Sequence, residues 1–343
     1  MSLQPLPGFE HFPTHHCVTG SLRHIYAFNA YPISEDMLLG LGAGIGFVYW
    51  HQKTTLPFLG GRANIERPGV EGLEKTIGRR TGVQVQTYRT SSPARAEKRL
   101  LELLGDDQPV LLILDMGYLP YFDFGGETFH FGYHVVVACG YDSASQEVLL
   151  ADRDQPLHVV PMAAIRQARG STYKPFPPQH GWHEFDFSQK QPFEPAALCQ
   201  AIHEAAHGML EPPITNLGVK GIRKAAQRIP EWPSVLAEKA LRDACINTAI
   251  MIDARGGTGG GLFRYMYARF LLEAAEHTGL DELEKAAGQM QAAGDCWQEV
   301  STLFERAYRA EQLVKHLESV APLLLHVADK EQGIWERLKN VVS

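Results

Sequence analysis

Cys17 is the residue whose type and surroundings first indicate nucleophilic chemistry. It directly follows His15 and His16, and apolar side chains at helical spacing follow it over residues 22–26. A cysteine in the first turn of a helix lies at the positive end of the helix dipole, which favours thiolate over thiol. A thiolate acts as a catalyst only when a base and an orienting group are supplied from elsewhere in the fold.

His134 and Asp152 are the residues that we expect to supply them. His134 stands at the head of an apolar segment, 133–141, that predicts a buried strand, and Asp152 ends the next predicted strand, 18 residues further on (152 − 134 = 18). Two strands of one hairpin can place the carboxylate beside the imidazole and fix its tautomer. Asp154 is the second choice for this role. The alternative is a buried free cysteine, a histidine at the edge of the core and an aspartate in a turn.

The elements around these residues predict an α+β domain followed by an all-α domain. Helices are expected first, and three strand segments over 133–160 are then joined by short loops, which is typical of an antiparallel sheet. From residue 195 nearly every segment has helical character, with Pro and Gly at the breaks. We therefore predict a catalytic domain over 1–170, a linker over 171–194 and a helical domain over 195–343.

Composition restricts the classes of function. The formal net charge is −7, which argues against general nucleic-acid binding. No apolar run approaches the ~18 residues of a membrane span. The first seven residues lack the basic and apolar regions of a signal peptide, so we expect a cytoplasmic protein without membrane contact. The five cysteines are odd in number and form no CxxC pair, which argues against a disulfide framework and a cysteine zinc site.

Three segments of the chain resemble the butirosin biosynthesis protein H N-terminal family. They are His16-Cys17-Val18-Thr19-Gly20-Ser21-Leu22, Ser34-Glu35-Asp36-Met37-Leu38-Leu39-Gly40-Leu41-Gly42-Ala43-Gly44 and Gly132-Tyr133-His134-Val135-Val136-Val137-Ala138-Cys139-Gly140-Tyr141-Asp142. The helical half resembles the uncharacterised domain that is often joined to that family. Residues 133–142 together with Asp152 are similar to the second half of bacteriocin-processing C39 cysteine peptidases.

This resemblance implies a papain-like cysteine-protease fold with Cys17, His134 and Asp152 as its triad. It also implies acyl transfer in secondary metabolism, from the phosphopantetheine thioester of an acyl carrier protein to an amine-bearing small molecule. The phosphopantetheine would be carried by the partner protein, and no cofactor or metal would be bound to this chain. A papain-like amidase or peptidase is the first alternative, and a non-catalytic binding protein with the same fold is another. A homo-oligomer is compatible with either function.

The chain departs from the papain and C39 pattern at the oxyanion hole. That pattern has a glutamine about six residues before the cysteine, and His11 stands at this place (17 − 11 = 6). The oxyanion would then be bound by the backbone N–H of Cys17 and by a second donor. The candidates for the second donor are His11, His15 and His16.

A basic stretch lies between residues 79 and 99, where six basic residues are accompanied by one acidic residue. A solvated helical face is the plainer interpretation, and a docking patch for the acidic carrier protein is the alternative. The basic residues are Arg79, Arg80, Arg89, Arg95, Lys98 and Arg99.

Two motifs in the helical half have chemical interpretations of their own. His203 and His207 match the HExxH zinc-hydrolase pattern on a helix, but a third ligand is missing at the expected positions. A glycine-rich stretch over 256–261 precedes a helix and either cradles a phosphate or closes over a substrate as a flexible loop. Candidate substrate contacts are Glu35, Gly259, Gly260, Arg264 and Tyr267.

Overall fold

The chain folds into two compact units. The sheet unit comprises residues 1–38 and 82–191, and the helical unit comprises residues 39–81 and 192–343. The computed structural model describes residues 3–52, 55–67, 69–124 and 129–342. The first two residues of the N-terminus discussed above therefore lie outside the described ranges.

These units differ from the predicted domain boundaries in two places. Residues 39–81 belong to the helical unit, because a hairpin within this range packs on its helices and Arg80 forms an ion pair with Glu204. The segment predicted as a linker, 171–194, contains a strand of the main sheet. Both differences arise from contacts between residues far apart in the chain, which the local composition does not reveal.

The sheet unit is built on a six-stranded antiparallel sheet with the strand order β3-β8-β4-β5-β6-β7. The predicted α+β character and antiparallel pairing are thereby confirmed. The strands are β3 (Gln84–Tyr88), β4 (Val110–Leu114), β5 (His134–Asp142), β6 (Glu147–Ala151), β7 (His158–Pro161) and β8 (Trp182–Asp186).

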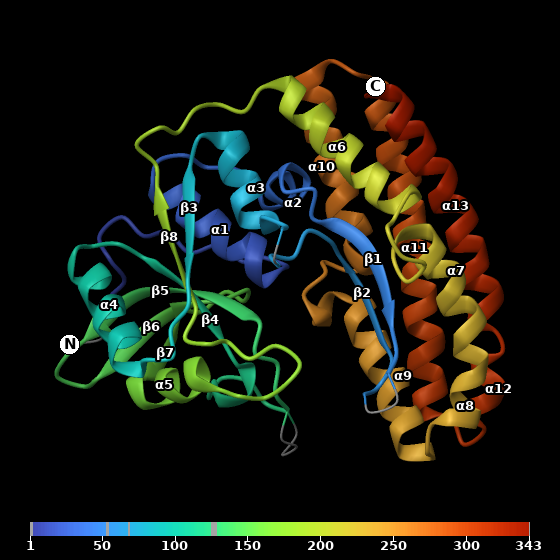
Figure 1. Ribbon diagram of the computed structural model, residues 1–343, viewed down its shortest axis with the longest axis horizontal. Coiled ribbons are helices and arrows are strands. Elements are labelled where there is room, and N and C mark those ends of the chain that lie inside the picture. The colour runs from blue at the N-terminus through green and yellow to red at the C-terminus, as the bar shows by residue number, and fades with distance from the viewer. Residues whose placement is uncertain (1–2, 53–54, 68, 125–128, 343) are drawn as a thin grey trace. The chain divides into compact units, whose positions relative to one another are not determined.

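Strands β4 and β5 are the most deeply buried part of this sheet, with every residue of β4 buried. Such continuous apolar strands are expected where both faces of a sheet are covered. Helix α1 (Cys17–Phe28) packs on β5, while α4 (Pro93–Gly105) and α5 (Met162–Gly170) pack on each other and on β4 (Figure 1). The direct pairing of Leu114 with His134 places His134 where β4 ends and β5 begins.

Helix α1 begins at Cys17 because His16 acts as its N-cap. His16 has an extended backbone (φ −114°, ψ 132°), and its ring accepts from the backbone N–H of Thr19. The first intrahelical hydrogen bond runs from the N–H of Gly20 to the carbonyl of His16, at 2.7 Å. A Cβ atom on Gly20 would lie 2.2 Å from Thr14 Oγ1, so only glycine lets the preceding segment cross the helix this closely.

The helical unit contains nine α-helices that its described residues form in full. They are α3 (Gly72–Thr81), α6 (Pro195–Leu210), α7 (Gly218–Arg228), α8 (Trp232–Val235), α9 (Glu238–Ile252), α10 (Arg264–Thr278), α11 (Glu282–Arg309), α12 (Leu313–Leu317) and α13 (Val320–Val341). Helix α2 (Glu35–Leu41) begins in the sheet unit and ends in this one.

Helix α11 is the centre of the helical unit and packs against α9, α10 and α13 (Figure 1). The antiparallel hairpin of β1 (Ile45–Trp50) and β2 (Phe58–Arg62) packs on α7 and α9. The largely helical character of the C-terminal half is therefore confirmed, although a hairpin from the N-terminal half joins it. Within the described ranges, no helix combines the length and the apolar character needed to cross a lipid bilayer.

Candidate active site

Cys17 and His134 meet where α1 packs on β5. The thiol shares a hydrogen bond with the imidazole, and the backbone N–H of Val135 also binds the sulfur. Ser21, one turn along α1, donates its hydroxyl to the carbonyl of Val135 at 3.3 Å and ties the helix to the strand. Cys17 remains partly exposed, whereas Cys139 in β5 is buried. The fold thus brings the predicted nucleophile and base together and leaves Cys17 partly exposed.

Asp152 binds the other side of the same imidazole. His134 Nε2 lies 2.6 Å from Asp152 Oδ2, and both side chains are 2% exposed. This contact leaves Nδ1 as the ring nitrogen for the thiol. The second-choice carboxylate, Asp154, instead lies 2.8 Å from His158 Nε2 through its Oδ1. The arrangement joins a thiol, an imidazole and a carboxylate in the order that a nucleophile, base and orienting group have in a catalytic triad.

The electrostatics of this site favour an ion pair. Burial alone raises the pKa of the Cys17 thiol, but the hydrogen bond and charge of His134 outweigh it and lower that pKa. Burial also disfavours the His134 imidazolium, but the charge and hydrogen bond of Asp152, and then those of Cys17, raise the His134 pKa to about 9. Against its own burial, Asp152 has a pKa well below the usual range, chiefly because of His134. Both shifts favour a thiolate beside an imidazolium over a neutral thiol–imidazole pair.

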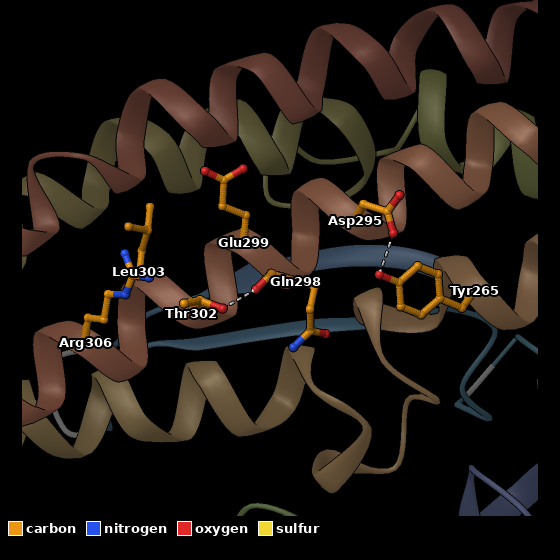
Figure 2. A pocket seen from close by; sticks show the side chains of 7 residues that line it. All are labelled: Tyr265, Asp295, Gln298, Glu299, Thr302, Leu303 and Arg306. Carbon is orange, nitrogen blue, oxygen red and sulfur yellow. Dashed lines mark hydrogen bonds between the residues drawn. The ribbon is translucent and has the colours of Figure 1, made fainter.

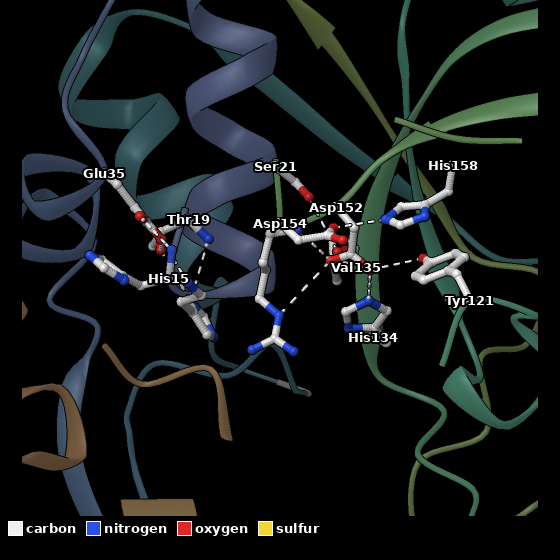
Figure 3. Close-up of polar contacts among 12 residues, drawn as sticks. His15, Thr19, Ser21, Glu35, Tyr121, His134, Val135, Asp152, Asp154 and His158 are labelled. Carbon is white, nitrogen blue, oxygen red and sulfur yellow. Dashed lines mark hydrogen bonds and ion pairs between the residues drawn. The ribbon is translucent and has the colours of Figure 1, made fainter. Parts of the chain in front are cut away.

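Tyr121 binds the same carboxylate and was missed by the sequence reasoning. Its hydroxyl donates to Asp152 Oδ2 at 2.8 Å, and its ring stacks on His158 with the ring centroids 3.8 Å apart (Figure 3). The backbone N–H of Arg153 donates to Asp152 Oδ1 at 2.8 Å. Tyr121 lies in a loop between strands with several other aromatic residues, so no spacing in the sequence distinguishes it.

Glu35 anchors the segment before Cys17, which does not fit its predicted role as a substrate contact. Its carboxylate accepts from the backbone N–H groups of His15 at 2.9 Å and His16 at 2.7 Å, and from the Thr19 hydroxyl at 3.1 Å (Figure 3). The side chain is buried, and burial raises the pKa of Glu35. These bonds fix the peptide groups that lead into the nucleophile.

The predicted oxyanion donors lie in three different environments. His11 Nε2 lies 2.7 Å from the carbonyl oxygen of Asp154, so Nε2 carries the proton. The Nδ1 atom of His11 is buried without a hydrogen-bond partner and, in the neutral ring, is an acceptor that cannot bind an oxyanion. His16 caps α1 with its ring, and His15 is exposed. The backbone N–H of Cys17, in the first helical turn where such groups lack an intrahelical acceptor, remains the first donor.

Comparisons with protein families match both halves of the chain. Residues 16–153 match the family described as butirosin biosynthesis protein H, N-terminal, and residues 163–338 match a domain of unknown function, DUF4872. The second match covers 176 residues (338 − 163 + 1 = 176), more than half of the 343. The chain belongs to the DUF4872 family. The predicted resemblance to both families is thereby confirmed. No curated protein matches the chain.

The family match and the folded units divide the chain differently. The DUF4872 match begins at residue 163, within α5, and includes strand β8. The structure places both of these elements in the sheet unit. The first part of the DUF4872 sequence therefore completes the sheet that holds His134.

Arg264 and Tyr267, predicted as substrate contacts, are buried in the DUF4872 region. Arg264 Nε and Nη2 each donate to the Glu331 carboxylate at 2.8 Å, and Nη1 donates to the carbonyls of Leu262 at 2.8 Å and Gly46 at 3.0 Å. Both residues are 0% exposed. Tyr267 packs against neighbouring aromatic rings of the core. Neither side chain reaches solvent, so the predicted substrate role does not fit their positions.

The glycine-rich stretch serves close packing of the backbone. Gly259 and Gly260 have left-handed φ values of +67° and +84°. A Cβ atom on Gly261 would lie 2.8 Å from the Cα of Gly294 in α11, so the two backbones approach each other closely at this point. The predicted substrate role of Gly259 and Gly260 stays a prediction.

The HExxH motif lies on α6 without the partners of a metal site. Glu204 forms an ion pair with Arg80 at 2.7 Å, and His207 lies 3.6 Å from Glu211. Over the ranges that the structure describes, no group of three or more His, Cys, Asp and Glu side chains is arranged to hold a metal ion.

The basic stretch between residues 79 and 99 is divided between the two units at residue 82. Arg80 is buried and paired with Glu204 in the helical unit. Arg99 is paired through two bonds with Glu184, at 2.9 and 2.7 Å, in the sheet unit. Arg79 also lies 3.3 Å from Glu71 and Lys98 lies 3.7 Å from Glu102, so four of the six predicted docking charges are paired within their own units.

A shallow pocket of about 420 Å³ lies in the helical unit (Figure 2). It is lined by Tyr265 and by one face of α11, from Asp295 to Arg306, and the Tyr265 hydroxyl bonds Asp295 at 2.8 Å. None of the residues predicted for catalysis or substrate binding lines this pocket.

Proposed function

We propose that this DUF4872 protein is a cysteine acyltransferase in which Cys17 is first acylated and then deacylated by an amine. The series of contacts from Cys17 through His134 to Asp152 carries this proposal, since it ends at a partly exposed thiol of lowered pKa. We also propose a papain-like catalytic arrangement, with the nucleophile at the start of a helix and the base on a strand beneath it. The description of the matching family, a butirosin biosynthesis protein, supports a biosynthetic role.

The first half-reaction transfers the acyl group to the enzyme. The Cys17 thiolate attacks the carbonyl carbon of a thioester, and the oxyanion accepts a hydrogen bond from the Cys17 backbone N–H. Collapse of this intermediate breaks the original carbon–sulfur bond, and the departing thiolate takes the proton of the His134 imidazolium. One thioester is exchanged for another, so the step needs little driving force.

The second half-reaction releases the product. A neutral amine attacks the acyl-Cys17 carbonyl, His134 accepts the proton that the nitrogen loses, and the Cys17 thiolate leaves with an amide formed. Asp152 stabilises the imidazolium in both halves without being protonated. Water in place of the amine gives hydrolysis, the second candidate, which the partial exposure of the thiol favours.

A phosphopantetheine thioester on an acyl carrier protein is the donor that we propose, and an amine-bearing small molecule is the acceptor. The proposal does not use the 79–99 stretch as the carrier site, because Arg80 and Arg99 are already paired.

An acyl-enzyme assay tests the proposed function. Incubation with an acyl-pantetheine thioester should add one acyl mass to the protein, as read by intact mass spectrometry, and Cys17→Ala should abolish the adduct. Cys199→Ala is the matched control, since Cys199 is also a partly exposed cysteine, and it should keep the adduct. Addition of an amine should discharge the adduct as amide, whereas a hydrolase would release the free acid at the same rate without amine. An adduct that survives in Cys17→Ala would contradict the mechanism.

A further inference from the structure

A row of aromatic side chains begins at the catalytic histidine. We define the aromatic row as Phe122, Phe124 and Phe129. Phe122 meets the His134 ring edge-on, with centroids 5.4 Å apart at 82°. Phe124 stacks on Phe122 at 5.8 Å, and Phe129 packs on Phe124 at 5.0 Å. The contacts therefore run without interruption from the site of acyl transfer to Phe129.

The row is open to solvent along its length. Phe122 and Phe124 are partly exposed, and Phe129 is 43% exposed. Single exposed apolar residues are common, but exposed aromatic rings in mutual contact are typical of a binding surface. Packing of the main core does not account for Phe124 and Phe129, since neither belongs to the core cluster of the sheet unit or packs against it.

We propose that the aromatic row binds the acyl group of the donor thioester, and that this acyl group is apolar. The inference rests on the proposed function, because an acyl group on Cys17 Sγ is held beside His134, where the row begins. The three rings offer apolar faces and no charge, so they favour an alkyl or aryl chain over a chain with amino or carboxyl groups. The amine acceptor supplies the polar part of the product.

The dependence of the Cys17 acylation rate on the length of the acyl chain tests this inference. The probes are acetyl, butanoyl, hexanoyl and 4-aminobutanoyl thioesters of N-acetylcysteamine, and the rate of adduct formation is measured by intact mass. We expect kcat/KM to rise about two- to four-fold for each added methylene, the upper value being the effect of removing one methylene from water. The 4-aminobutanoyl thioester should react no faster than the acetyl thioester.

Two variants locate the effect. Phe124→Ala and the more exposed Phe129→Ala should each reduce the hexanoyl-to-acetyl ratio at least three-fold. Phe176→Ala is the matched control. Phe176 lies in the same unit and is 41% exposed, and its ring packs on Phe131 and Tyr133. It should keep the wild-type ratio.

The outcomes separate this inference from the proposed function. Acylation by the acetyl thioester with no rise toward hexanoyl overturns the apolar acyl group and leaves the acyltransferase intact. If Phe124→Ala and Phe129→Ala both keep the wild-type rise in kcat/KM with chain length, the aromatic row does not bind the acyl group. Failure of every thioester to acylate Cys17 overturns the proposed function, and this inference with it.

Discussion

Two buried charged networks of the molecule invite comparison, one in each unit. In the sheet unit, Asp152 binds His134, and His134 binds Cys17. In the helical unit, Glu331 binds Arg264 and also accepts from two tryptophan N–H groups, at 2.6 and 3.1 Å. Both networks join opposite charges in an apolar surrounding, which costs desolvation unless the partners are well placed.

The two networks differ in how they end. Arg264 and Glu331 are 0% exposed, and Arg264 places each of its three guanidinium nitrogens in a hydrogen bond. The network of the sheet unit ends instead at Cys17, which is partly exposed and has a lowered pKa. A closed network fixes packing, whereas the open one carries the effect of a buried carboxylate to a partly exposed residue.

Asp152→Asn should produce the largest effect on the open network. Acylation of Cys17 should fall about 10²- to 10⁴-fold, in the range known for loss of a triad carboxylate. Because the charge of Asp152 is the largest influence that raises the His134 pKa to about 9, that pKa should fall in the variant. The imidazolium, which protonates the departing thiolate, would then be lost at lower pH, so the high-pH limb of kcat/KM for acylation should move to lower pH.

Asp154→Asn is the matched control for this variant. Asp154 is the neighbouring carboxylate that the sequence left as second choice, and it bonds His158 instead of His134. Its substitution should change the acylation rate less than about three-fold. Equal losses in the two variants would show that the open network has been assigned to the wrong carboxylate.

Arg264→Met should produce the largest effect on the closed network, and the effect should be on stability. Removal of one partner leaves a buried charge unpaired, which costs about 3–5 kcal/mol of unfolding free energy. The double variant Arg264→Met/Glu331→Gln should recover at least about 1 kcal/mol, because glutamine keeps acceptors for the tryptophans without the charge. Urea unfolding measures both.

Arg255→Met is the control for the closed network. Arg255 pairs with Asp253 at 2.8 Å on the surface, where its side chain is 49% exposed. Its loss should cost no more than about 1 kcal/mol. If Arg264→Met costs as little, the buried pair does not stabilise the helical unit and the contrast between the two networks fails.

The residues of the open network were predictable because each belongs to a local pattern. Cys17 precedes a helical apolar stripe, His134 begins an apolar strand and Asp152 follows the next strand of the same hairpin. The antiparallel sheet then follows from the short loops between the strands. These patterns depend on neighbours in sequence, which the sequence shows directly.

The environments that the sequence did not predict depend on neighbours in space. Arg264 follows a glycine-rich loop, as a phosphate-binding residue would. Its partner in the fold is Glu331, which lies 67 positions further along the chain. Glu35 opens a helix as an ordinary acidic residue would, yet it binds the backbone before Cys17. Strand β8 lies in a proline-rich stretch and pairs between β3 and β4. The hydrophobic periodicity of a segment does not show which distant residues it will contact.

Glu35→Gln should weaken the support of the nucleophile helix. The carboxylate accepts hydrogen bonds from three donors, and a glutamine has only one oxygen to replace its two. We expect a loss of about 1.5–3 kcal/mol in unfolding free energy, the range for hydrogen bonds to a charged group. Acylation of Cys17 should fall several-fold as the preceding peptides lose their fixed orientation. An unchanged urea midpoint would contradict the anchoring role.

Tyr121→Phe should produce the smallest effect and is the finest test of the comparison. The substitution removes the hydroxyl that donates to Asp152 Oδ2 but keeps the ring that stacks on His158, so the urea midpoint should hardly change. The same oxygen binds His134 Nε2, and without the tyrosine it has one donor fewer to hold its position. We expect kcat of acylation to fall about three- to ten-fold, equivalent to about 1 kcal/mol, with KM unchanged. A kcat equal to that of the wild type would mean that Asp152 is the last member of the open network on its buried side. A lowered kcat would add Tyr121 to the network.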